Sequence, residues 1–136
     1  MPMRPLILAV LPAVFLAMSL AAQDFDCANS ETQIEMTACA EQDWRAADAD
    51  LNDAYKSALA MMQEYDMALP KAQQGAAAHL RDAQRAWITF RDETCSAEGY
   101  QVHGGSMEPM VIYGCQARIT ADRAEDLWAM AAGDPN

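Results

Sequence analysis

The sequence has few β-branched residues, and neither Asn-Gly nor Asp-Gly occurs anywhere in it. Both dipeptides are common in tight β-hairpins, and β-branched side chains favour strands. Alanine, by contrast, is abundant. This composition argues against a β-sheet domain and predicts an all-α protein.

Basic residues are also scarce. The 136 residues include nine Lys and Arg against twenty Asp and Glu, which gives a net charge of −11. Such an acidic chain is a poor match for nucleic acid or for an anionic membrane, because both repel it. The charge suits a basic protein partner, although an acidic surface also serves simple solubility.

The longest apolar run is too short to span a bilayer comfortably. It covers Leu6–Met18, is interrupted by Pro12, and follows a basic start that contains Arg4. Small residues follow at Ala21 and Ala22, as at a signal-peptidase site. We therefore predict a cleaved secretory signal peptide, with an uncleaved membrane anchor as the alternative.

The signal peptide is expected at residues 1–22 and a single mature domain at residues 23–136, with 133–136 as a frayed tail. Without Arg4, eight Lys and Arg face twenty Asp and Glu, so the mature chain has a net charge of −12. We expect it to be periplasmic or secreted, with no membrane anchor after cleavage.

All four cysteines lie in the mature part, and no Cys-x-x-Cys motif occurs. An even number of cysteines in an exported chain predicts two disulfides. Of three possible pairings, Cys27–Cys39 and Cys95–Cys115 are favoured because they are closest in sequence, and each would add about 3 kcal/mol. The gaps do not match paired zinc ligands.

Apolar residues recur in helical steps of three and four along two segments. The first stripe is Ala40, Trp44, Ala47, Leu51, Ala54, Ala58, Met62 and Tyr65; the second is Ala76, Leu80, Ala83, Trp87, Phe90 and Thr94. Ser30 or Thr32 is suited to cap the first helix, and Leu69-Pro70 should end it. Residues 99–109 should form a loop before a weaker third stripe that contains Cys115, Ile119, Leu127 and Met130.

The two long helices should form an antiparallel hairpin that turns near Pro70, with the third helix completing a small disulfide-linked bundle. Counting outward from Pro70 sets Asp48 level with Arg91 and Tyr55 level with Gln84. We predict a partly buried Asp48–Arg91 ion pair with Asn52 and Gln84 nearby, while Trp87 and Phe90 fill the seam between the helices. A structural role for these polar residues is favoured over a functional one.

Several of these residues together resemble the LprI-like lysozyme-inhibitor family. The resemblance rests on Cys39, Asp48-x-x-Leu51-Asn52-x-x-Tyr55, Gln84-Arg85-x-Trp87, Phe90-Arg91-Asp92-x-x-Cys95, Gly104-Gly105-Ser106, Cys115 and Arg123. It implies a small exported helical domain with disulfides and an activity against lysozyme. Unlike the family's namesake lipoprotein, this chain has no lipobox cysteine.

Neither catalysis nor a bound cofactor is expected. His79 and His103 are the only histidines, and Ser106 near His103 has no obvious carboxylate to orient a triad. Copper is the strongest metal alternative, because thioethers and imidazole suit Cu(I), but methionine is also a common core filler. The residues that such a copper site would use are His103, Met61, Met62, Met67, Met107 and Met110.

If the partner is a basic protein such as a lysozyme, two parts of the chain are suited to bind it. Asp43, Asp50 and Asp53 fall within about 80° of helix surface and could form a docking face. The loop could occlude the enzyme's acidic cleft, with hydrogen-bond donors at His103, Gly104, Gly105 and Ser106. The alternative function is a periplasmic adaptor that never meets lysozyme.

Overall fold

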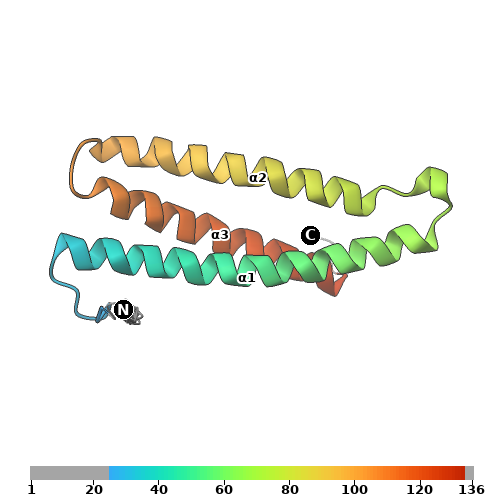
Figure 1. Ribbon diagram of the computed structural model, residues 1–136, viewed down its shortest axis with the longest axis horizontal. Helices are drawn as coiled ribbons and strands as arrows, with labels where there is room; N and C mark the ends of the chain where they lie inside the picture. The colour runs from blue at the N-terminus through green and yellow to red at the C-terminus, as the bar shows by residue number, and fades with distance from the viewer. Residues whose placement is uncertain (1–24, 134–136) are drawn as a thin grey trace, which may run out of the picture.

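The part of the chain that the computed structural model describes, residues 25–133, contains helices and no strand. The α-helices are α1 (Gln33–Ala68), α2 (Ala76–Gly99) and α3 (Glu108–Ala132), with 3-10 turns η1 (Lys71–Gln73) and η2 (Tyr100–Val102) between them. The all-α prediction is therefore confirmed (Figure 1). None of the helices within these residues has the length and hydropathy needed to cross a membrane.

Two predicted features fall at the chain ends. The signal peptide predicted at residues 1–22 lies outside the described residues, as do residues 134–136 of the predicted tail. Gly133, the first residue of that tail, ends α3 in the left-handed conformation with φ 77°, a conformation that glycine adopts without steric cost.

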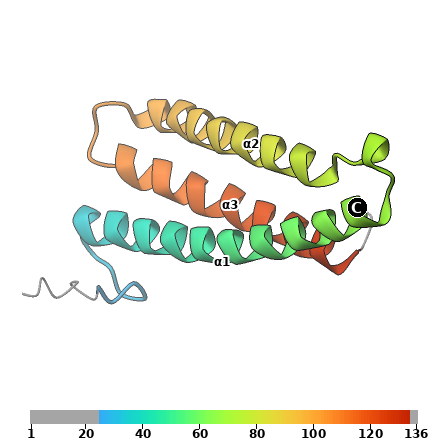
Figure 2. The same cartoon turned by 45° about the vertical axis from the view of Figure 1, so that its right-hand side comes forward.

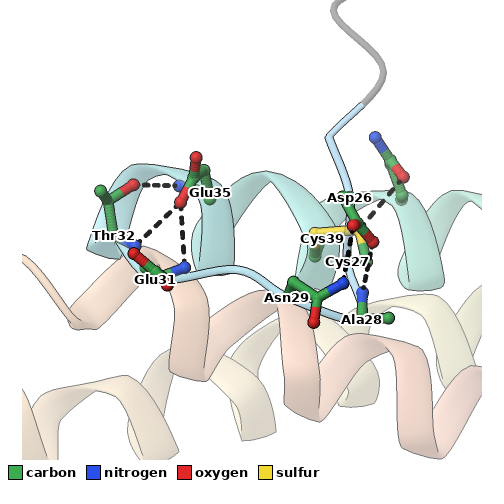
Figure 3. Close-up of a disulfide and its surroundings, with 9 residues drawn as sticks. Asp26, Cys27, Ala28, Asn29, Glu31, Thr32, Glu35 and Cys39 are labelled. Carbon is green, nitrogen blue, oxygen red and sulfur yellow. Dashed lines mark hydrogen bonds between the residues drawn. A yellow bond between two sulfur atoms is a disulfide. The ribbon is translucent and has the colours of Figure 1, made fainter.

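Helix α1 begins at a capping box. The Thr32 hydroxyl accepts a hydrogen bond from the Glu35 amide at 3.2 Å, and the Glu35 carboxylate accepts one from the Thr32 amide at 2.9 Å. These bonds, drawn in Figure 3, select Thr32 over Ser30 as the cap. The backbone donors around Glu35 lower the pKa of its carboxyl group.

The turn between α1 and α2 is held by Asp66. Its carboxylate accepts hydrogen bonds from the amides of Gly75, Ala76 and Ala77 at 2.8, 2.9 and 3.1 Å. These amides open α2 and have no partner within that helix, so a carboxylate from α1 caps its positive end. The same bonds lower the pKa of Asp66. This cap is tertiary, and the sequence did not predict it.

Helix α3 lies between α1 and α2, and this differs from the predicted arrangement (Figures 1 and 2). Helices α1 and α2 are antiparallel as expected. However, α1 packs mainly against α3, and these two helices run parallel to each other. The shared core is formed by Leu51, Ala54, Ala58, Leu80, Ala124 and Leu127. Alanines at these positions let α1 and α3 approach closely. Tyr55 and Trp87 pack against the edge of this core.

Phe90 was predicted to fill the seam, and this prediction is wrong. Its exposed fraction is 59%. The buried stripe of α2 runs through Leu80, Gln84, Arg91, Cys95 and Gly99, with Trp87 half-buried on the same face. Phe90 lies about 100° around the helix from Arg91, so it points away from α3. Tyr65, the last member of the first stripe, is likewise exposed.

Both disulfides have the pairing that the sequence spacing favoured. Cys27–Cys39 ties the segment before α1 to the second turn of that helix (Figure 3). Cys95–Cys115 joins α2 to α3 across a Cα–Cα distance of 5.4 Å, and both of its residues are buried. The second bridge therefore holds the two helices together next to the loop that connects them.

Candidate protein-binding surface

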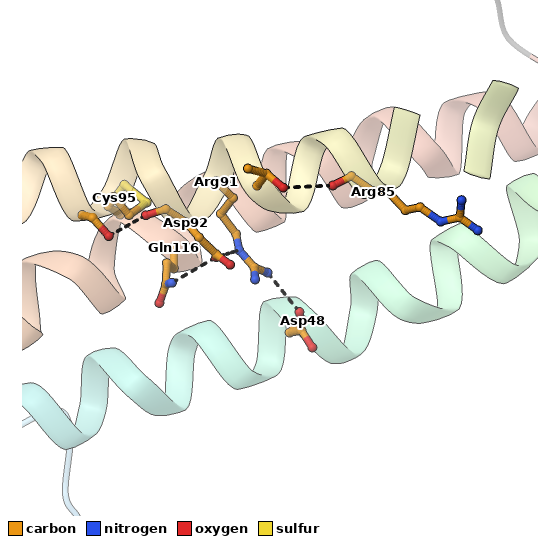
Figure 4. Close-up of polar contacts among 9 residues, drawn as sticks. Asp48, Arg85, Arg91, Asp92, Cys95 and Gln116 are labelled. Carbon is orange, nitrogen blue, oxygen red and sulfur yellow. Dashed lines mark hydrogen bonds and ion pairs between the residues drawn. A yellow bond between two sulfur atoms is a disulfide. The ribbon is translucent and has the colours of Figure 1, made fainter. Parts of the chain in front are cut away.

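A polar network around Arg91 connects all three helices (Figure 4). Its Nη1 donates to Asp48 Oδ1 of α1 at 3.3 Å, and its Nε donates to Asp92 Oδ1 of α2 at 2.8 Å. The same Asp92 oxygen accepts a 3.4 Å hydrogen bond from Gln116 Nε2 of α3. The predicted Asp48–Arg91 ion pair is confirmed; Asp92 is a second partner of Arg91, and Gln116 of α3 joins the network through Asp92.

The Arg91 side chain is only 9% exposed, and aromatic rings enclose it. Its guanidinium carbon lies 5.7 Å from the ring centroid of Trp44 and 5.4 Å from that of Trp87. Cation–π contacts and two carboxylates thus replace the water that the charge loses. This arrangement fits a residue that sets the register of the helices.

The other predicted members of this polar network divide between two places. Asn52 Nδ2 donates to Asp48 Oδ2 at 3.2 Å, as expected from their spacing. Gln84 instead accepts a 3.2 Å hydrogen bond from Arg123 Nε of α3. The expected contact between Gln84 and the α1 residues assumed that α1 and α2 touch along their length, whereas α3 lies between them.

The loop between α2 and α3 is held together by Glu108. One carboxylate oxygen lies 2.8 Å from His103 Nδ1, and the other accepts a 2.8 Å hydrogen bond from the Gly104 amide. The Gly105 amide donates to the Val102 carbonyl at 3.0 Å. The prediction that Gly104 and Gly105 present free N–H donors is therefore wrong, because both amides are used inside the loop.

Glu108 opens α3, and it was not among the predicted site residues. A carboxylate in the first turn of a helix directly after a glycine-rich loop is a recognisable signal, because it can accept from loop amides. The His103 contact and the Gly104 amide lower the pKa of Glu108. Gly104 has φ 76°, where an L side chain would be strained.

His103 stacks on Tyr100, with ring centroids 4.4 Å apart. Glu108 is thus a carboxylate that orients His103, and the sequence did not predict this contact. No hydrogen bond joins His103 to Ser106 in the described part of the chain, so the contact between nucleophile and base that a triad requires is missing.

The residues considered for copper are spread over the bundle. Met110 Sδ accepts a 3.4 Å contact from Gln33 Nε2. Met61, Met62 and Met67 lie in the C-terminal half of α1. That half of the helix is at the end of the bundle opposite the loop between α2 and α3 (Figure 1). Among residues 25–133 no group of three or more His, Cys, Asp or Glu side chains is placed to hold a metal ion.

A groove of about 600 Å³ opens beside the loop. It is lined by Trp44 of α1, by Gly104 and Gly105 of the loop, and by Glu108, Pro109, Ile112, Tyr113 and Gln116 of α3. Trp44 and Tyr113 stack along its wall with centroids 5.6 Å apart. Gly104 and Gly105, which were predicted as partner-binding residues, thus line the same groove as Trp44 and Tyr113, which were not.

The three predicted docking carboxylates are exposed but differ in their partners. Asp50 Oδ1 accepts a 3.0 Å hydrogen bond from Trp128 Nε1, and Asp53 pairs with Lys56 at 3.0 Å. Asp43 and Asp50 lie about 100° or more around α1 from Trp44. The acidic face is therefore separate from the groove.

Comparison with known proteins finds similarity to a protein family, to a single relative and to a solved structure. The family profile described as "Lysozyme inhibitor LprI" matches residues 26–127, which is most of the chain. An uncharacterized protein of Rhizobium meliloti (strain 1021) is 45% identical over 105 residues, covering 75% of this chain and 76% of that protein.

A solved structure is similar as well. The crystal structure of a DUF1311 family protein from Pseudomonas putida KT2440 superposes with a TM-score of 0.64. It covers 78% of this chain and 100% of its own, at 23% sequence identity. At this identity the likeness concerns the fold alone.

Proposed function

Because the chain belongs to the LprI lysozyme-inhibitor family, we propose that it is an exported protein that binds and inhibits lysozyme-type muramidases. The observation that carries this proposal is the family match over residues 26–127. Two disulfides support export, because such bonds persist in oxidising compartments. The predicted signal peptide at residues 1–22 would direct that export.

Charge supports a basic enzyme as the partner. The stretch from residue 24 to residue 53 contains nine Asp and Glu and a single basic residue, Arg45. A negative surface of this kind speeds the encounter with a positive one. We assign this steering to the exposed carboxylates of Asp43, Asp50 and Asp53.

The loop end of the bundle is proposed to occlude the enzyme's cleft. His103, Gly104, Gly105 and Ser106 form a projection between α2 and α3, and Glu108 holds it from inside. A loop that is already ordered loses little conformational freedom on binding. Its contribution is then shape, together with the exposed Ser106, since the glycine amides are occupied.

A muramidase assay tests the proposal. The oxidised protein, purified from a bacterial periplasm, is added at micromolar concentration and physiological salt to a basic secreted lysozyme. We expect cell-wall lysis to slow in proportion to the inhibitor added. Unchanged lysis would contradict the proposal and would favour an adaptor that binds another envelope protein.

Replacement of Gly104, Gly105 and Ser106 by bulky residues tests the role of the loop. Inhibition should be lost, because the altered loop no longer fits the cleft. The matched control is Phe90→Leu, an exposed aromatic on α2 outside the loop. Full inhibition by the loop variant would remove the loop from the mechanism without removing the activity.

A further inference from the structure

The groove lined by the stacked rings of Trp44 and Tyr113 has the chemistry of a site for a cation. Its aromatic wall is a stacked pair with an interplanar angle of 21°. The Trp44 ring already stacks on Tyr113 and has the Arg91 guanidinium 5.7 Å from its centroid, so the Tyr113 ring is the member of the pair that would attract a further guanidinium or ammonium group. The groove volume, about 600 Å³, lies within the range of about 300–1,000 Å³ that is usual for binding pockets.

The polar groups of the groove accept hydrogen bonds. Glu108 contributes a carboxylate whose pKa is lowered by His103 and by the Gly104 amide, so it stays ionised. Gln116 uses its Nε2 to donate to Asp92, which leaves the amide oxygen as an acceptor. No Lys, Arg or His is among the residues that line the groove.

The surroundings of the groove are also negative. Glu41 and Asp48 lie one turn before and one turn after Trp44 on the surface of α1. Arg45 pairs with Glu41. Arg91 lies over the Trp44 ring and pairs with both Asp48 and Asp92. The two arginines near Trp44, Arg45 and Arg91, are therefore paired with three carboxylates.

We propose that this groove is an anchor pocket for one arginine or lysine side chain of a basic protein partner. The apolar stem of the side chain would lie against Ile112 and Pro109. Its charged end would lie between the aromatic wall and Glu108, where a planar guanidinium fits best. Buried arginine and aromatic pairs of this kind often dominate the affinity of protein interfaces. The proposal builds on the inhibitor function proposed above and names how the partner is held.

The test uses two substitutions at one position. Gln116→Lys places a cation in the groove, and Gln116→Met fills similar space without charge. With a basic lysozyme we expect Gln116→Lys to raise the inhibition constant about tenfold or more and Gln116→Met to change it much less. Thermal unfolding of both variants controls for folding. Equal inhibition by the two variants would overturn the anchor while leaving the inhibitor function intact.

A second measurement does not depend on lysozyme. N-acetyl-arginine amide is titrated into the 15N-labelled protein and compared with N-acetyl-norleucine amide, whose shorter, neutral side chain supplies an apolar stem without a guanidinium. We expect the arginine compound alone to shift the signals of the Trp44 indole and of the Gly104 and Gly105 amides, and Gln116→Lys to abolish the shifts. Equal shifts from both compounds would overturn the proposal. Arginine-specific shifts without any inhibition would support the pocket and reject lysozyme as the partner.

Discussion

Arg91 and Glu108 each hold several polar partners, but their surroundings differ. Arg91 is buried among three helices, with two tryptophan rings against its guanidinium. Glu108 holds His103 and Gly104 at the exposed end of the bundle. The Arg91 guanidinium itself is packed where water has little access, because its side chain is only 9% exposed, whereas His103 at the loop is 60% exposed and can be hydrated if it loses its partner. The first cluster thus maintains the fold, and the second shapes a surface.

The largest effect should come from removing the buried cation. Arg91→Leu removes both ion pairs and both ring contacts of a side chain that is only 9% exposed, so we expect the free energy of unfolding to fall by about 3 kcal/mol. The melting temperature should fall by about 15 °C. Arg85→Leu on the same helix is the control, because that side chain is 77% exposed and pairs only with Asp82. Equal melting temperatures for the two variants would contradict the assignment.

Two glycines near the loop sharpen the comparison between tight and open packing. A Cβ at Gly99 would lie 2.6 Å from Ile112 Cγ1, whereas a Cβ at Gly114 meets no atom within 4 Å. We expect Gly99→Ala to destabilise the protein by about 1–2 kcal/mol. Gly114→Ala should stabilise it by up to about 1 kcal/mol, because alanine favours helix. Urea unfolding measures both, and a stabilised Gly99→Ala would show that α2 and α3 do not pack this closely.

The acidic face should affect the rate of binding more than the lifetime of the complex. Reversal of Asp43, Asp50 and Asp53 to Lys should slow association with a basic lysozyme about tenfold at low salt and flatten its salt dependence. Surface plasmon resonance measures both rates. Reversal of Asp82, Glu93 and Glu125 changes the net charge equally at other exposed positions. If both triple variants slow association equally, the location of the charge is irrelevant.

The smallest effect is expected at Glu108. Its pKa is lowered in the folded state, so its ionised form stabilises the fold above the ordinary carboxyl pKa. That contribution is lost as the pH falls through the lowered value. The melting temperature of Glu108→Gln should therefore lie below that of the wild type at neutral pH, by less than for Arg91→Leu, and converge with it at acid pH. A gap that widens on acidification would contradict this sign.

The predictions that succeeded depend on residues close in sequence or on one short connection. Thr32 caps α1 through a residue three positions later, and the disulfides join neighbouring cysteines. The Asp48–Arg91 pair follows from two helical periods and one turn near Pro70. Each of these needs little knowledge of how the third helix packs.

The predictions that failed depend on α3. Phe90 was predicted to lie buried between helices, but it is exposed and points away from α3. Gln84 was expected near α1 residues, but it accepts a hydrogen bond from Arg123 of α3. The amides of Gly104 and Gly105 were expected to be free, but Glu108 accepts from Gly104 and the Val102 carbonyl accepts from Gly105. The groove was not predicted, because Trp44 and Tyr113 are far apart in the sequence and meet only when α3 packs on α1.

By itself the sequence determined the helical fold class, the two ends of α1, the disulfide partners and the acidic charge, because periodicity, caps and composition act over a few residues. Only the tertiary structure decided that α3 lies beside α1, that Asp66 caps α2 and that an aromatic groove forms next to the loop. These features join residues that are distant along the chain. Which of several apolar faces meet is settled by how closely small and large side chains can pack.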